Sequence, residues 1–233
     1  RRDGGEIYTS THADSVEGGP MARVRAGRHS IVADAVVVAT NSPINDRVAI
    51  HTKQAPYMTY AIAARVEPGS IRKGLYWDTC DPYHYVRLHE ARGREFLVVG
   101  GEDHKSGQAN DTVNRHGRLE RWARKRFPAM GAVEAAWGGQ VMQTLDGLAY
   151  IGRNPRDEDN VYVVTGDSGT GITHGTIAGI LLTDLILGRR NAWQKIYDPS
   201  RKPVRAAGTF VKEAANMAAQ FGDWLKPGEV ARD

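Results

Sequence analysis

A strand, a glycine-rich turn and a long apolar helix in immediate succession constrain this chain more than any other feature. The β-branched and aromatic run at residues 161–164 predicts the strand. Gly166, Gly169 and Gly171 follow, and glycine permits positive φ and a close approach of the backbone to a partner. The helix then runs to Gly188, a suitable C-terminal stop. A helix N-terminus behind such a turn offers N–H groups and a partial positive charge, which is the geometry of a binding site for an electron-rich ligand.

The same pattern also has a purely structural interpretation. Strand–turn–helix units without a ligand are common in α/β proteins, and the spacing here matches neither G-x-G-x-x-G nor G-x-x-x-x-G-K-[ST]. We expect Ser168 or Thr173 to cap the helix, and His174 to lie on its first turn. The rest of the chain has to decide between the two interpretations.

The positive charge of the chain suggests a different class of function. The formal net charge is +4, and the densest basic run covers residues 118–126. At helical spacing Leu119, Trp122, Ala123 and Phe127 form an apolar stripe, with the cations on the opposite face. A solvated helix face explains this pattern. The alternative is a non-enzymatic basic α/β module that binds nucleic acid or a protein partner.

Length and cysteine content restrict the remaining classes. The 233 residues are enough for one large domain or two small ones with a stable core. Cys80 is the only cysteine, which excludes an internal disulfide and favours a cytoplasmic location. The longest apolar run, residues 177–187, is too short to span a bilayer, so no membrane role is expected. The chain starts without Met or a signal-peptide pattern, which indicates a fragment or a processed chain.

The first forty residues predict β-structure. We expect a strand over residues 6–12 and a hairpin over residues 21–32. The continuous apolar run at residues 35–40 predicts a strand buried on both faces of a parallel sheet. Because ligands in open α/β sheets bind at the carboxyl ends of strands, Thr40 and Asn41 are candidate site residues.

An antiparallel meander is predicted for the middle of the chain. Short polar links join its four strands, at residues 57–66, 74–78, 83–89 and 95–101. In the third strand Tyr83, Tyr85 and Arg87 share one face and are candidates to line a pocket for an anionic or aromatic substrate. A polar outer face of the sheet is the alternative. A further strand is expected over residues 133–142, and a helical stripe from Val204 to Leu225.

The chain carries no motif of a self-contained catalytic machine. It has no G-x-S-x-G, no H-E-x-x-H and no Walker lysine. Its eight histidines lack ligand spacing, so no metal site is expected. Cys80 has no neighbouring base to lower its pKa, and we expect its thiol to be unreactive.

Three stretches nevertheless resemble, in the right order, FAD-dependent oxidoreductases of the D-amino-acid oxidase / glycine oxidase type. Residues 33–41 resemble the A-D-x-V-V-x-A-T/A-G strand of that family. Residues 137–152 resemble its W-x-G-x-R-P-x-T-x-D-G-x-P-x-I-G segment. Residues 161–175 resemble its last strand and G-x-x-G-x-G turn, whose helix points at the flavin ring. The implied fold is α/β with α+β character, namely part of a flavin-binding α/β domain with an inserted antiparallel-sheet substrate domain.

The resemblance also implies a reaction and a site. The cofactor would be FAD, and a small amine, amino-acid-like or hydroxy substrate would transfer a hydride to it. The cofactor-binding positions implied are Thr40, Asn41, Gly166, Asp167, Gly169, Thr170, Gly171 and Ile172. The substrate-side positions implied are Tyr83, Tyr85, Arg87, Gln143 and His174. No nucleic-acid partner is expected under this interpretation.

The same resemblance divides the chain. Residues 1–45 and 143–195 would belong to the FAD-binding domain, and residues 46–142 would form the substrate domain. Residues 196–233 would be a helical tail or linker.

Two departures from the family pattern bear on these expectations. The N-terminal βαβ unit with the G-x-G-x-x-G turn is not in this chain, so we expect the chain alone to bind FAD weakly or not at all and to be inactive. The family arginine that binds the substrate carboxylate falls on Val141, with Met142 in place of proline. Arg87 is the candidate replacement.

A narrower resemblance concerns an iron–sulfur domain. Residues 76–78, 83–87 and 100–104, with the alanine-rich tail, resemble a bacterial subgroup in which a Rieske domain follows the oxidase body. A 2Fe–2S cluster would then belong to a domain beyond residue 233, because this chain has no Cys/His ligand pairs.

Overall fold

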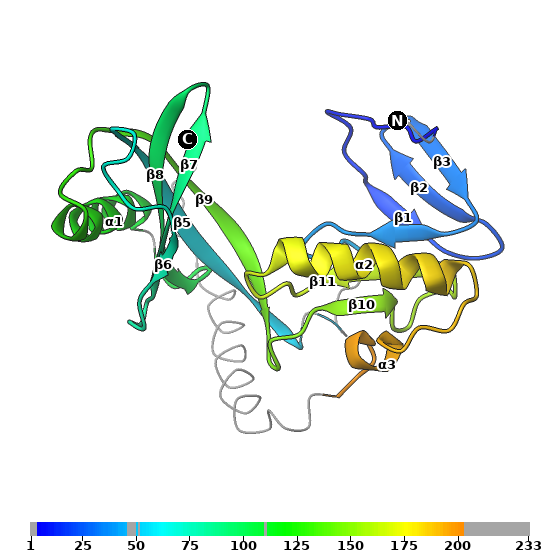
Figure 1. The fold of residues 1–233 in the computed structure, drawn as a ribbon. Helices are drawn as coiled ribbons and strands as arrows, with labels where there is room; N and C mark the ends of the chain where they lie inside the picture. The colour runs from blue at the N-terminus through cyan, green and yellow to red at the C-terminus, as the bar shows by residue number, and fades with distance from the viewer. Residues whose placement is uncertain (1–3, 46–49, 51, 110, 203–233) are drawn as a thin grey trace, which may run out of the picture. The chain divides into compact units, whose positions relative to one another are not determined.

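The chain forms two compact units. The structure is a computed structural model that describes residues 4–45, 50, 52–109 and 111–202 (Figure 1). Unit 1 comprises residues 1–55 and 142–233, and unit 2 comprises residues 56–141. The helix predicted between Val204 and Leu225 lies outside the described residues.

The first sheet of unit 1 contains the predicted hairpin. It is antiparallel, in the order β1 (Ser15–Glu17), β2 (Ala22–Ala26) and β3 (His29–Ala33). The strand predicted over residues 6–12 is wrong, because this segment takes no strand conformation. Ile7 and Tyr8 are 64% and 62% exposed, so their side chains have no buried face to pack on, and β-propensity depends on such packing.

The second sheet of unit 1 positions the glycine-rich turn. Its strand order is β10 (Tyr150–Arg153), β11 (Val161–Thr165) and β4 (Val36–Val38). β11 pairs in parallel with β4 and antiparallel with β10, so the parallel pairing predicted for residues 35–40 is confirmed. Burial on both faces is not, because Val37 is 41% exposed on a strand that has only one neighbour among the described residues.

Helix α2 (Gly171–Ile186) covers this sheet, and the short helix α3 (Gln194–Tyr197) packs against β10. The helix follows the predicted course, since Gly188 has φ +69° just beyond its last turn. It shares its buried stripe with strand residues in one core, made up of Ala149, Ile151, Tyr162, Ala178, Leu181 and Leu182.

Unit 2 is the predicted antiparallel meander with one helix. Its five-stranded sheet has the order β6-β7-β8-β5-β9. The strands are β5 (Gln54–Val66), β6 (Leu75–Trp77), β7 (His84–Ala91), β8 (Arg94–Lys105) and β9 (Val133–Thr144). The first residues of β5 and the last residues of β9 belong to unit 1.

Helix α1 (Thr112–Arg126) packs on one face of this sheet through the predicted apolar stripe. Leu119 and Ala123 are fully buried, and Trp122 and Phe127 pack at the margin of the same core. Val86, Leu97 and Val99 belong to that core as well. Because side chains alternate along a strand, Tyr85 and Arg87 point to the face opposite α1.

No helix in the described part of the chain is both long enough and apolar enough to cross a membrane.

Candidate functional site

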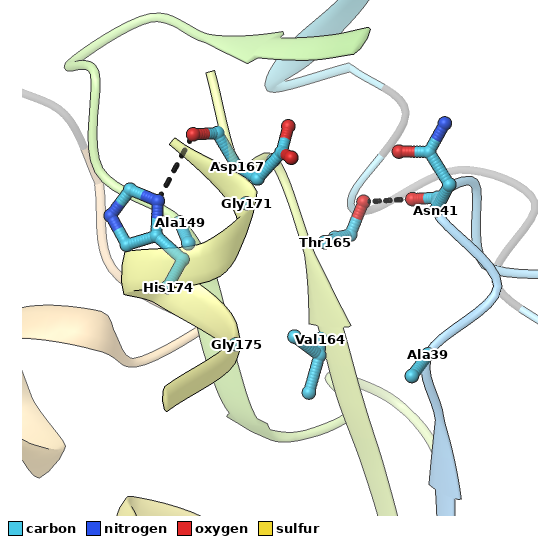
Figure 2. Close-up of a pocket in the computed structure, with 10 residues that line it drawn as sticks. Ala39, Asn41, Ala149, Val164, Thr165, Asp167, Gly171, His174 and Gly175 are labelled. Atoms are coloured by element: carbon cyan, nitrogen blue, oxygen red, sulfur yellow. Dashed lines mark hydrogen bonds between the residues drawn. The ribbon is translucent and has the colours of Figure 1, made fainter. Parts of the chain in front are cut away.

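The glycine-rich turn lies at the carboxyl end of β11, beside the carboxyl end of β4 and at the N-terminus of α2 (Figure 2). Two parallel strands therefore deliver their last residues to the same edge of the sheet. Thr165, the last residue of β11, ties the two ends together, because its hydroxyl donates to the main-chain oxygen of Asn41. Gln54 Nε2 donates to the same hydroxyl at 3.0 Å.

The backbone of the turn depends on glycine at two positions. Gly166 has φ +73° and Gly169 has φ +83°, a region that side chains with a Cβ rarely adopt. Gly166 is also confined, since a Cβ there would lie 2.3 Å from Thr144 Cγ2. The predicted role of these glycines is thus confirmed for the backbone conformation. Gly171 differs, because it is helical and its Cβ position faces Asp167 Oδ2 at 2.6 Å.

Helix α2 begins without a side-chain cap. The residue at the cap position is Thr170, and it makes no side-chain hydrogen bond of the capping type. The predicted caps are therefore wrong. Ser168 is turned away, with its Oγ 3.2 Å from the Thr144 N–H, and Thr173 already lies inside the helix. The backbone N–H groups of the first helical turn are consequently left to partners other than a capping side chain.

The main-chain oxygen of Asp167 organises the turn from inside. It accepts from the Thr170 N–H at 2.9 Å and from the Thr170 hydroxyl at 2.8 Å. His174 Nδ1 lies 3.0 Å from the same oxygen and 3.0 Å from Thr170 Oγ1. His174 is buried, and its ring meets that of Tyr197 edge-on at 6.0 Å. His174 thus braces the turn in this structure.

A cavity of about 200 Å³ opens at this point of unit 1. Five of the predicted site residues line it, namely Asn41, Gly166, Asp167, Gly171 and His174 (Figure 2). The other predicted cofactor positions, Thr40, Gly169, Thr170 and Ile172, are not among the lining residues. The Thr40 hydroxyl donates to the Ser42 main-chain oxygen at 2.7 Å, and Ile172 is 91% exposed.

Sequence reasoning missed the remaining lining residues, which are Ala39, Ala149, Val164, Thr165 and Gly175. Thr165 had a usable signal, because it ends a strand at the same sheet edge as Thr40 and Asn41. Ala149 had none, since it directly precedes β10 and reaches the cavity only through the tertiary fold.

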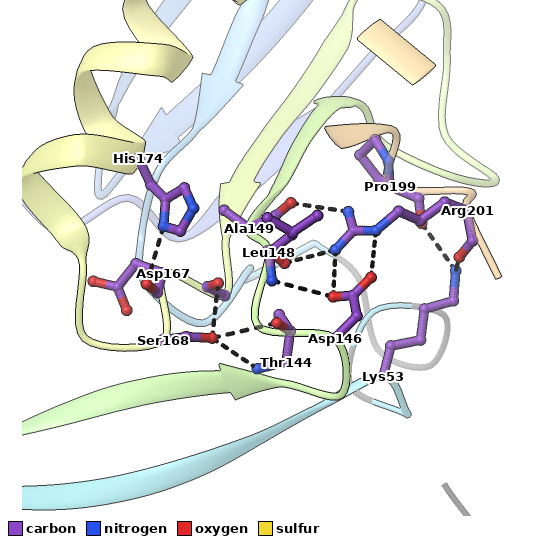
Figure 3. Close-up of polar contacts among 11 residues, drawn as sticks. Lys53, Thr144, Asp146, Leu148, Ala149, Asp167, Ser168, His174, Pro199 and Arg201 are labelled. Carbon is purple, nitrogen blue, oxygen red and sulfur yellow. Dashed lines mark hydrogen bonds and ion pairs between the residues drawn. The ribbon is translucent and has the colours of Figure 1, made fainter. Parts of the chain in front are cut away.

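Arg201 holds the loop between β9 and β10 through a group of polar contacts (Figure 3). The Arg201 guanidinium makes two hydrogen bonds to the Asp146 carboxylate, at 2.8 and 2.9 Å. It also donates to the main-chain oxygens of Leu148 and Ala149, at 2.6 and 2.9 Å. The guanidinium carbon lies 3.9 Å from the centre of the Tyr150 ring. This segment after α3 was not expected to take part, because nothing in its sequence shows what Arg201 binds.

These contacts set the ionisation of the supporting groups. Burial alone would raise the pKa of Asp146, but the hydrogen bonds and positive charge of Arg201 outweigh burial and lower it. Tyr150 is fully buried, and burial raises its pKa to about 12 despite the nearby Arg201. Asp146 is thus a carboxylate, and Tyr150 a neutral phenol, throughout the physiological range.

The predicted substrate-side residues are divided between the units. Tyr83, Tyr85 and Arg87 belong to unit 2, whereas Gln143 and His174 belong to unit 1. The two tyrosine rings lie 6.1 Å apart, which confirms that they share a face. Tyr83 is 42% exposed and precedes the first residue of β7.

Among the described residues, no group of three or more His, Cys, Asp or Glu side chains is arranged to hold a metal ion. Cys80 is exposed, and the hydrogen bond and negative charge of Asp78 raise the pKa of its thiol. This agrees with an unreactive thiol.

Comparison with known proteins gives consistent results. Residues 1–185 match the family model described as FAD dependent oxidoreductase. The chain is 26% identical over 200 residues to a protein of Bacillus subtilis (strain 168) named putative Rieske 2Fe-2S iron-sulfur protein YhfW, covering 85% of this chain and 39% of that protein. It is 25% identical over 209 residues to glycine oxidase of Bacillus licheniformis, covering 85% of this chain and 54% of the enzyme.

The fold comparison points the same way. The crystal structure of glycine oxidase from Geobacillus kaustophilus superposes with a TM-score of 0.68 at 20% identity, covering 84% of this chain and 53% of that one. The chain therefore spans about half the length, or less, of the relatives it matches.

Proposed function

The chain belongs to the FAD dependent oxidoreductase family, and from this premise we propose that it supplies two parts of a longer flavoenzyme. Unit 1 would contribute the end of the FAD site that faces the flavin ring, and unit 2 would be the substrate domain. The observation that carries the proposal is the cavity at the uncapped N-terminus of α2, lined by Asn41, Gly166 and Gly171.

The residues of this cavity fit an electron-rich ring. The first-turn N–H groups of α2 and the positive end of the helix favour a ligand that carries negative charge or carbonyl oxygens. Gly166 and Gly169 have positive φ values that favour glycine, and because glycine has no side chain they place none at the approach to the helix. At about 200 Å³ the cavity is smaller than the roughly 300–1,000 Å³ of complete small-molecule sites. It therefore suits one end of a dinucleotide whose other end is held elsewhere in the longer protein.

In the proposed reaction FAD, when bound, accepts a hydride from the substrate carbon. The task of this chain is binding and orientation. Gly169, Gly171 and Ile172 would direct main-chain N–H groups to the electron-rich edge of the ring, which favours its reduced form. Thr40 and Asn41 would lie towards the ADP portion. The Arg201–Asp146 pair would hold the turn in place without touching the cofactor.

We propose a small amine or amino-acid-like compound as the substrate, with a hydroxy compound as the less favoured class. The glycine oxidase relative supports an amino compound. Tyr83, Tyr85, Arg87, Gln143 and His174 remain our candidates for the substrate side. His174 is the weakest of these candidates, because it is buried and its Nδ1 already contacts the main-chain oxygen of Asp167 in the turn.

The basic-module alternative loses support in the structure. Most cations of α1 that sequence reasoning placed on a free surface have partners within the chain. Arg118 pairs with Asp111 at 2.8 Å, and Arg124 pairs with Glu120 at 2.7 Å. The Arg126 guanidinium lies 4.2 Å from the centre of the Trp122 ring. The two ion pairs reduce the positive field that α1 offers to a phosphate backbone, whereas the contact with Trp122 leaves the charge of Arg126 in place.

The longer protein is proposed to be a cytoplasmic bacterial enzyme, which the single cysteine and the bacterial relatives support. A 2Fe–2S domain after this chain is part of the same proposal, supported by the relative named as a Rieske protein.

The test is the visible spectrum of the purified longer protein. We expect a flavin absorption band that is bleached when a small amine is added without oxygen. A protein that is colourless and stays so after incubation with FAD would overturn the proposal. A yellow protein whose flavin is reduced by no amine or amino acid would contradict the proposed substrate class but not the proposed cofactor.

A further inference from the structure

A β-bulge in β8 changes the direction of two acidic side chains. In the pairing of β5 with β8, Met58 stands opposite His104 and Tyr60 opposite Gly101. Thr59 therefore faces two residues, Glu102 and Asp103. Such an extra residue bends the strand and re-aims the side chains around it, and bulges occur often next to functional sites.

Glu102 takes an unfavourable backbone conformation to form this bulge. Its φ is +57° although it is not glycine, and the residue is buried. A conformation of this kind persists only where the surroundings impose it. The Glu102 carboxylate lies 3.4 Å from His84 Nε2 and 3.5 Å from Arg118 Nη1. Arg115 Nη1 donates to its main-chain oxygen at 2.7 Å.

His84 is itself held firmly. Its Nδ1 lies 3.0 Å from Asp78 Oδ2, and its ring stacks on that of Trp122 with centres 4.4 Å apart. The cluster of His84, Asp78, Glu102 and Trp122 thus fastens the bulge to α1 on one face of the sheet.

The bulge sends Asp103 towards the opposite face, to the two tyrosines. Its side chain hydrogen-bonds to Thr59, and its charge acts on both Tyr83 and Tyr85. Gly100 makes room for this arrangement, because a Cβ there would lie 2.1 Å from the Tyr85 ring. Gly100 and the bulge together allow the Asp103 carboxylate to act on this pair of aromatic rings.

The Asp103 carboxylate is short of donors. Its Oδ1 is buried and has no hydrogen-bond partner within the described structure. Burial raises the pKa of Asp103, and the opposing influence of Thr59, His104 and Arg115 does not cancel this rise. Arg115 is already engaged by Asp111 at 2.7 Å. Leaving a buried acceptor unpaired is costly, and a nearby positive charge would stabilise the Asp103 carboxylate even without a donor at Oδ1 itself.

We propose that Asp103, together with Tyr83 and Tyr85, forms the subsite that binds the cationic amine of the substrate. The carboxylate supplies the opposite charge, and the faces of aromatic rings attract cations. This inference rests on the proposed function, because it names the group by which that substrate is held. Val141 stands where the family motif carries its carboxylate-binding arginine, which agrees with recognition through the amine. Arg87 lies on the same face beyond Tyr85, so it would meet an acidic end of the substrate.

The test is calorimetric titration of the longer protein with two probes of equal shape and opposite charge, n-butylammonium chloride and sodium butyrate. We expect the wild-type protein to bind butylammonium more tightly than butyrate. Asp103→Asn keeps the shape and removes the charge, so it should weaken butylammonium binding about tenfold or more and abolish the preference. Glu120→Gln, a loss of one negative charge on the helix of the other face, should bind both probes like the wild type.

Unchanged butylammonium binding in Asp103→Asn would overturn the inference, as would a wild-type protein that binds butyrate at least as tightly as butylammonium. A wild-type preference for butyrate needs no variant, so it would overturn the inference even if Asp103→Asn fails to fold. The readout does not use the flavin. A colourless protein with Asp103-dependent amine binding would contradict the proposed function alone, and a yellow protein with Asp103-independent binding would contradict this inference alone.

Discussion

At the scale of single residues, the turn between β11 and α2 shows which glycines are needed and for what reason. Gly166 combines a positive φ with a Cβ position already filled by Thr144, whereas Gly169 has a positive φ but open space around it. The sequence shows both as glycine and cannot separate them. The difference arises from Thr144 and Gln54, which the fold brings in from other parts of the chain.

Alanine at the two positions should separate strain from crowding. Gly169→Ala should cost about 1–2 kcal/mol in the free energy of unfolding, the usual penalty of a left-handed conformation for a residue with a Cβ. Gly166→Ala should cost clearly more, because it adds overpacking of typically 1–3 kcal/mol to the same strain. Urea denaturation of both variants measures the two values. Equal losses of unfolding free energy in the two variants would show that Thr144 and Gln54 move aside without cost, contrary to the packing in the structure.

Asp78 carries a residue-scale prediction about pH. Burial alone would raise its pKa, but hydrogen bonds from the backbone and ring of His84 and from Cys80 lower it to about 2, from an ordinary value of 3.8. A carboxyl with a depressed folded-state pKa stabilises the fold above its ordinary pKa, and this stabilisation is lost as the pH falls towards 2. Asp78→Asn should therefore be less stable than the wild type at pH 6, with the gap narrowing by pH 3. Denaturation at both pH values measures the gap, and a gap that does not change with pH would contradict this account of His84 and Asp78.

At the scale of elements, hydrophobic patterns in the sequence predicted most of the described strands and both long helices among the described residues. The ends and caps of these elements were harder to predict. The apolar stripe of α1 and the course of α2 follow from local sequence, because each needs only one buried face. The cap of α2 could not be predicted, since Ser168 has a better partner in Thr144 from a distant strand. The strand expected at residues 6–12 failed for the opposite reason, as Ile7 and Tyr8 find no surface to pack on.

The Arg201 contact is the link between elements that offers the clearest test. Arg201 and Asp146 side chains are only 12% and 23% exposed, and the guanidinium also serves two main-chain oxygens. Arg201→Met should leave these acceptors short of donors and cost about 3 kcal/mol of unfolding free energy. Arg153→Met is the matched control. Its pair with Asp159 is 58% and 92% exposed, so its loss should cost less than about 1 kcal/mol. Similar losses in the two variants, measured by urea denaturation, would remove the supporting role of Arg201.

At the scale of the whole molecule, the family and the mixed α/β fold class could be anticipated from ordered motifs, and the substrate could not. The parallel pair β4 and β11 and the antiparallel meander of unit 2 match what those motifs imply. The proposed amine subsite escapes sequence reasoning because it depends on where a bulge points a carboxylate. Glu102 and Asp103 are adjacent acidic residues that the sequence alone cannot distinguish. The backbone conformation at Glu102 directs their side chains towards different faces of the sheet.

Flavin retention by the longer protein tests the central claim most directly. Gly171→Asp places a carboxylate at the cavity and at the N-terminus of α2, where an acidic residue favours the helix itself. A Cβ at this position would lie 2.6 Å from Asp167 Oδ2, so the Asp167 side chain has to rotate away. With that adjustment the variant should fold while repelling an electron-rich ring. We predict that it purifies with flavin affinity lowered at least about tenfold, enough to lose the cofactor during purification. Gly179→Asp, on the same helix with open space around it, should remain as yellow as the wild type. A folded Gly171→Asp protein with the full flavin content of the wild type would contradict the assignment of this turn to the flavin site.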